Sequence, residues 1–111
     1  MLCLERRGLV AIALAAVVLL GGCAAFRAAL LYDRGSDALE RGEVERAVAD
    51  LERAATLAPH ASEIQNHLGL AYAASGREED ALHAFRRAVK LDCDNRQALH
   101  NLAAAEQRTA P

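Results

Sequence analysis

The chain has 111 residues, with 13 Lys and Arg against 15 Asp and Glu, a formal net charge of −2, and only two prolines. This length holds one small domain, and its many Ala, Leu, Arg and Glu residues favour helices. The slightly acidic balance, with no patch that combines aromatic and basic residues, argues against nucleic acid as a partner.

The chain begins with a segment typical of a secretory signal peptide. Arg6 and Arg7 precede an unbroken apolar run over residues 9–20, and small residues follow it. As a helix, this run would be about 18 Å long, which is too short to cross a hydrocarbon core of about 30 Å. We therefore predict a signal peptide over residues 1–22.

The residues Leu20-Gly21-Gly22-Cys23 closely resemble a bacterial lipobox, in which an aliphatic residue and two small residues precede a cysteine. This resemblance implies a lipoprotein: cleavage before Cys23, acylation of Cys23, and residues 23–27 as a lipidated N-terminus and tether. Several acyl chains anchor a protein firmly. In this class an aspartate after the cysteine favours retention at the inner membrane, and Ala24 stands there instead, so we expect the outer membrane, facing the periplasm.

Two alternatives for this segment remain open. Residues 9–26 can serve as an uncleaved, single-pass anchor in the inner membrane if the two glycines are tolerated within the span. Ordinary cleavage after Ala25 would instead release a periplasmic protein without a lipid.

A stretch of about 34 residues occurs twice, over residues 28–61 and 62–95, and the two copies align without a gap. A period of this size indicates stacked helix pairs. The matching positions are Gly35 with Gly69, Gly42 with Gly76, Ala47 with Ala81, Leu51 with Phe85, Ala54 with Ala88, and Leu57 with Leu91.

Each copy is predicted to form two helices, over residues 30–42 and 43–59 and over residues 63–76 and 77–93. Gly42 and Gly76 lie where a left-handed residue ends a helix, and Pro59 stops the second helix of copy one. Residues 96–108, with Leu99 and Leu102 on one stripe, are predicted to form a capping helix that covers the open end of the stack. Residues 109–111 are a tail.

These residues resemble the tetratricopeptide repeat. Copy two matches its pattern at Leu68, Gly69, Tyr72, Gly76, Ala81, Phe85 and Ala88. It departs at Gln65, where a large apolar residue is usual, and at Cys93, which replaces a proline. Copy one departs at Arg34, in place of leucine, and at Ala38, in place of tyrosine. It matches at Leu31, Gly35, Gly42, Ala47, Leu51, Ala54 and Pro59.

The resemblance implies an all-α fold: a short right-handed solenoid of two repeats and a C-terminal capping helix, after an N-terminal signal or anchor segment. We expect small residues such as Gly69, Ala81 and Ala88 to let paired helices approach closely. Leu68, Tyr72 and Phe85 would fill the space between the turns.

In this family the first helices line a concave groove that holds an extended or helical peptide. We expect the Asn66 amide to pair with a partner's backbone, and Tyr32 and Leu70 to offer apolar contact. No lysine or arginine stands at the groove positions, so recognition of a terminal carboxylate is not expected. The alternative is that so short a stack has no deep groove. Carried over by repeat position, the candidate groove residues are Tyr32, Ser36, Asn66, Leu70, Ala73, His100 and Ala104.

The sequence offers no catalytic motif, phosphate loop or paired His/Cys cluster, so no enzyme activity, cofactor or metal is predicted. His67 and His100 occupy neighbouring positions in successive first helices, but two histidines make a weak metal site. Cys93 is interpreted as a partly buried small side chain, with an intermolecular mixed disulfide as the alternative.

The predicted function is that of a non-catalytic, lipid-anchored periplasmic adaptor or scaffold. It would mediate protein–protein interactions in an envelope assembly such as pilus, secretion or cell-wall machinery, and the sequence names no partner. One alternative is a structural subunit that self-associates through its end faces. Another is an accessory domain that positions a cell-wall enzyme.

Overall fold

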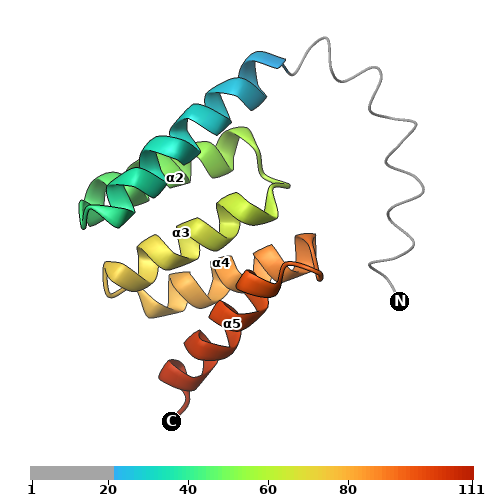
Figure 1. Cartoon of the computed structure of the whole chain (residues 1–111). Helices are drawn as coiled ribbons and strands as arrows, with labels where there is room; N and C mark the ends of the chain where they lie inside the picture. The colour runs from blue at the N-terminus through green and yellow to red at the C-terminus, as the bar shows by residue number, and fades with distance from the viewer. Residues whose placement is uncertain (1–21) are drawn as a thin grey trace.

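The computed structural model describes residues 22–111, and the residues of the predicted signal peptide up to residue 21 lie outside that range. Within it, the chain forms five helices and no strand. They are a helix over residues 22–40, α2 (Val44–Leu57), α3 (Ser62–Ala74), α4 (Glu78–Leu91) and α5 (Arg96–Thr109). The all-α fold predicted from the sequence is confirmed (Figure 1).

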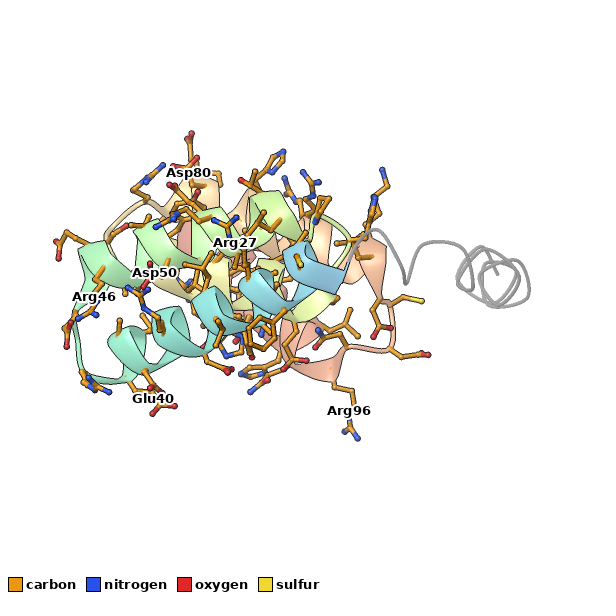
Figure 2. The ribbon with its side chains drawn as sticks, turned by 90° about the horizontal axis from the view of Figure 1, so that it is seen from above. Arg27, Glu40, Arg46, Asp50, Asp80 and Arg96 are labelled. Atoms are coloured by element: carbon orange, nitrogen blue, oxygen red, sulfur yellow. The ribbon has the colours of Figure 1, made fainter. Side chains whose placement is uncertain are left out.

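The helices form two layers. The helix over residues 22–40, α3 and α5 are the first helices of successive units, and α2 and α4 are the second helices of the two repeats (Figure 1). Figure 2 shows Asp80 of α4 at the edge opposite Glu40 and Arg96, which belong to the first-helix layer. α3 packs against α2, α4 and α5, whereas α2 and α4 make no backbone contact with each other.

Glycine ends the first helix of each repeat, as the sequence predicts. Gly42 has φ 75° and Gly76 has φ 79°, the left-handed conformation that glycine adopts without steric cost. The amide of Arg77 then donates to the carbonyl of Tyr72 at 2.9 Å, and the same bond forms from Glu43 to Ala38 at 2.8 Å. These bonds satisfy carbonyls that the helix end would otherwise leave unpaired.

The two helices of each repeat meet at a glycine. A Cβ placed on Gly69 would lie 2.5 Å from Cε1 of Phe85, and one on Gly35 would lie 2.7 Å from Cγ of Leu51. Phe85 is only 1% exposed and Leu51 is fully buried. The expectation that Gly69 permits close approach is therefore confirmed, because any larger residue would collide with a packed side chain.

The last helix covers the second repeat. Ala105 of α5 joins Ala81 and Phe85 of α4 in one buried cluster, and half-buried Leu102 packs against it. The side chain of Asn95 caps α5 by accepting a hydrogen bond from the amide of Ala98 at 3.0 Å. α5 thus occupies the position of the capping helix and ends one residue beyond the predicted range.

Arg34 departs from the repeat pattern and has a partner in the second helix. Its Nη2 atom lies 3.5 Å from Oδ2 of Asp50 in α2, whose side chain is 7% exposed. A buried carboxylate is stable only when it is paired or hydrogen-bonded. The arginine therefore compensates an acidic residue that the second repeat replaces with Ala84.

The first helix extends beyond the packed body. Residues 23–27, predicted to be a tether, are helical, and each is exposed or half-buried. Burial begins at Ala28, which is 2% exposed. None of the helices in residues 22–111 is long and apolar enough to span a membrane.

Candidate functional site

Tyr32 of the first helix contacts His67 of α3 in the first-helix layer. The Tyr32 hydroxyl lies 3.3 Å from Nδ1 of His67, and the two rings meet edge to face with their centroids 4.9 Å apart. Burial raises the pKa of the Tyr32 hydroxyl, and the nearby negative charge of Glu63 raises it further. The phenol is therefore neutral at ordinary pH and holds its proton for hydrogen bonding.

Asn66 and Asn101 link α3 to α5. The Asn101 amide nitrogen donates to Oδ1 of Asn66 at 2.9 Å, and Asn66 is only 1% exposed. The Asn66 amide was predicted to pair with a partner's backbone, but Asn66 is buried and its Oδ1 atom already accepts a hydrogen bond from Asn101. Asn101 was not among the groove residues predicted from the sequence.

The other predicted groove residues differ in exposure. His100 is exposed and Ala104 is half-buried. Leu70 and Ala73 are half-buried against the cluster formed by α4 and α5. Ser36 is half-buried one turn after Tyr32. The structure thus brings His67 to Tyr32, and His100 lies exposed on α5.

A hollow lies on the other layer, where α2 and α4 stand apart. Its volume is about 570 Å³, and it is lined by residues of α2, α3 and α4, with Gln65, Leu68 and Tyr72 of α3 between the two second helices. This hollow was not predicted from the sequence. The signal that pointed to it was Gln65, a polar residue at a repeat position that normally holds a large apolar side chain.

One end of this hollow carries a compact polar network. The Tyr72 hydroxyl donates to Oε1 of Glu52 at 2.7 Å, and the Arg77 guanidinium stacks on the Tyr72 ring at 4.4 Å from its centroid. Arg77 also pairs with Asp80 at 2.8 Å and with Glu52 at 3.8 Å. Burial, followed by the hydrogen bond to Glu52, raises the pKa of Tyr72 to about 12.

The other end of the hollow is basic. His83 and Arg87 line it and also line a neighbouring depression together with Arg86 and Lys90. His83 is followed at positions i+3, i+4 and i+7 by Arg86, Arg87 and Lys90, so these four residues follow one face of α4. We call them the basic row of α4. The composition, with its net negative charge, gave no sign of this local excess of positive charge.

Cys23, the predicted lipid attachment residue, is exposed and carries a free thiol. Phe26 and Leu30 follow it at positions i+3 and i+7 and share its helix face, and they are 66% and 49% exposed. Cys93 is half-buried, as expected for a small side chain in its loop, and is not a free thiol. Among residues 22–111, no group of three or more His, Cys, Asp or Glu side chains could hold a metal ion.

The repeated helix pairs, the glycines at their crossings and the layer of first helices define a helical repeat protein. The family model for the tetratricopeptide repeat matches residues 32–96, and the chain belongs to that family. No curated protein matches the chain. Tetratricopeptide repeats generally mediate protein–protein interactions, so this chain is an interaction module in that broad sense.

Proposed function

We propose that this protein is a non-catalytic adaptor that presents its first-helix layer to a protein partner while Cys23 anchors it by lipid in the cell envelope. The observation that carries the binding role is the alignment of three first helices, tied by the Tyr32–His67 and Asn66–Asn101 contacts. These contacts fix the helices before any partner arrives, and a preorganised surface loses less conformational entropy on binding.

The proposed contact surface combines small and apolar positions with a few polar groups. Ala73 and Ala104 leave room beside the helices, Tyr32 and Leu70 supply apolar area, and His100 is exposed at the edge. Such a mixture suits a helical or extended segment of a partner protein. The partner would belong to an envelope assembly, with pilus, secretion and cell-wall machinery as the candidates.

Lipid anchoring rests on the sequence before Cys23 and on the surface after it. The lipobox-like residues end at an exposed, free thiol, and the exposed side chains of Phe26 and Leu30 continue from it along the same helix face. Apolar side chains beside an acylated residue would enter the lipid interface rather than remain in water. We propose the outer membrane facing the periplasm, with a single-pass inner-membrane anchor as the alternative.

The anchor is tested by Cys23→Ser. The native protein should fractionate with membranes and carry acyl chains on Cys23 in mass spectra of its N-terminal peptide, whereas Cys23→Ser should lose the lipid. A native protein whose Cys23 carries no lipid would contradict the anchoring proposal and leave the adaptor role standing.

The binding role is tested separately by Ala104→Arg, which places a long charged side chain on the proposed surface. The matched control is Ala103→Arg, which adds the same side chain at an exposed position of the same helix that is turned about 100° away from Ala104. Proteins that co-purify from crosslinked membranes with the native chain and with Ala103→Arg should be lost with Ala104→Arg. Identical sets from both variants, with unchanged circular dichroism, would contradict the proposed surface.

A self-associating subunit is the second candidate function, and Leu99 favours it. This side chain is 42% exposed on the terminal helix α5, where a further repeat would pack in a longer array. Leu99→Glu should then convert a concentration-dependent oligomer into a monomer in sedimentation experiments. Sedimentation of the native chain as a monomer at high micromolar concentration would dismiss this candidate.

A further inference from the structure

Gln65 breaks the internal repeat at a buried position. The residue 34 positions earlier is Leu31 and the residue 34 positions later is Leu99, so the other two units carry leucine at the same place. Leu31 is 7% exposed and packs in an apolar cluster. Gln65 is similarly buried, at 5% exposed, but brings a carboxamide instead of two methyl groups.

The Gln65 carboxamide has no partner of its own. It hydrogen-bonds to no group among the described residues, and it lines the hollow of about 570 Å³ between α2 and α4. Among the described residues, the side-chain atoms that are fully buried without a partner belong to Ser36 and Asp50, so the Gln65 carboxamide keeps access to the hollow. A few polar groups that face into a hollow are typical of ligand sites, because they orient the ligand.

The charges around the hollow differ between its two ends. At the end of Glu52 and Asp80, Arg77 lies between the two carboxylates and pairs with both. At the other end, no carboxylate among residues 22–111 lies within ion-pair distance of Arg87 or Lys90, and Arg86 has only an exposed pair with Glu106 at 3.6 Å. The basic row of α4 is therefore available to an anionic group.

From these observations we propose that the hollow between α2 and α4 is a second docking site, which binds an acidic peptide segment in extended conformation. The Gln65 carboxamide has one donor group and one acceptor group, which match the C=O and N–H of a peptide backbone. Arg87 lines the hollow and Lys90 lines the neighbouring depression. A segment that extends from the hollow into that depression can pair its Asp or Glu side chains with both residues.

The dimensions agree with a short segment. α4 has 14 residues, which corresponds to a length of about 21 Å. An extended peptide covers that length with about six residues. This site lies on the second-helix layer, so it is separate from the first-helix layer proposed above, and both can be occupied at once.

The test is a selection of random peptides of about eight residues, displayed on phage, against the full chain in detergent micelles. We expect the selected peptides to be rich in Asp and Glu. Gln65→Leu and Arg87→Glu should each weaken binding of the best synthetic peptide by about tenfold or more in fluorescence polarisation. The control Arg53→Glu, an exposed charge reversal on α2 outside the hollow, should leave binding unchanged.

Loss of folding does not explain the expected result. Gln65→Leu restores the residue found in the other two units, so its melting temperature should equal or exceed that of the native chain while binding is lost. Selection of no peptide, selection of neutral or basic peptides, or equal binding by Gln65→Leu would overturn the proposal.

Two other results would also overturn this proposal. If Ala104→Arg abolishes binding of the selected peptides and Gln65→Leu does not, the peptides bind the first-helix layer. That result would support the adaptor role and remove the second site. If the chain binds phosphatidylglycerol vesicles through Arg87 and Lys90 with no effect of Gln65→Leu, the basic row is a membrane contact instead.

Discussion

Gly69→Ala should destabilise the protein, although alanine is the better helix former. The new Cβ would lie 2.5 to 2.9 Å from Cε1, Cδ1 and Cζ of Phe85, whose ring is fully buried and cannot swing into solvent. Overpacking of this kind costs about 1 to 3 kcal/mol, against a gain in helix propensity of about 1 kcal/mol. Because all three contacts are shorter than 3.0 Å, we take the upper part of that range, about 2 to 3 kcal/mol, which leaves a net loss of about 1 to 2 kcal/mol in the free energy of unfolding.

Thermal denaturation followed by circular dichroism measures this loss. For a domain of this size, 1 kcal/mol lowers the melting temperature by about 4 to 8 °C, so a fall of about 4 to 16 °C is expected. A smaller side chain at position 85 should relieve the collision. The double variant Gly69→Ala with Phe85→Leu should therefore be more stable, by about 0.5 kcal/mol or more, than the sum of the two single changes predicts. An unchanged or raised melting temperature for Gly69→Ala would refute the close-packing argument.

Three further predictions concern other parts of the structure. Gly76→Ala meets no atom within 4 Å but keeps a φ of 79°, so it should cost about 1 to 2 kcal/mol by backbone strain alone, whereas Gly76→Asn should cost less in the same thermal assay. Asn101→Ala leaves Oδ1 of Asn66 buried without its donor, so the free energy of unfolding measured in urea should fall by about 1 to 3 kcal/mol. A fall of less than about 0.5 kcal/mol would show that water replaces the donor. The pKa of Tyr72 is raised to about 12 in the folded chain, so the contribution of Tyr72 to the free energy of unfolding should be complete below about pH 10 and lost as the pH rises toward 12. Glu52→Gln should lower the pKa of Tyr72 in a phenolate absorbance titration. An unchanged pKa would contradict the assigned hydrogen bond.

The fold could be predicted because its packing repeats along the chain. Gly69 and Phe85 occupy the same repeat positions as Gly35 and Leu51, and in both repeats the glycine lies against the larger side chain. A contact made within one repeat is encoded by nearby residues and recurs at a fixed offset. The helix order, the turns at glycine and the closely packed helix pairs could therefore be predicted from the sequence.

The candidate groove could be predicted only as a row of positions, because repeat position does not determine exposure. Tyr32, Asn66 and His100 are each 34 residues apart, yet Tyr32 is half-buried, Asn66 is buried and His100 is exposed. Asn66 is in the middle of the stack, where the helices on either side cover it. His100 is on the last helix, and no further unit among the described residues packs beyond it.

The hollow at Gln65 could not be predicted, because its walls come from helices in different repeats. Glu52 of α2 and Arg87 of α4 line the same space although no backbone contact joins their helices. The sequence showed only that Gln65 departs from the repeat pattern. The spacing between α2 and α4 decides whether the Gln65 position opens into a polar hollow, and this spacing cannot be read from the repeat pattern.

Site-specific photo-crosslinking in intact cells tests the adaptor role most directly. A photoreactive phenylalanine derivative at position 104 would lie on the proposed surface, whereas the same residue at position 103, which is exposed, would lie about 100° away around the same helix. The adaptor role predicts a discrete adduct with another protein from position 104 and none from position 103. No adduct at position 104, or equal adducts at both positions, would contradict it.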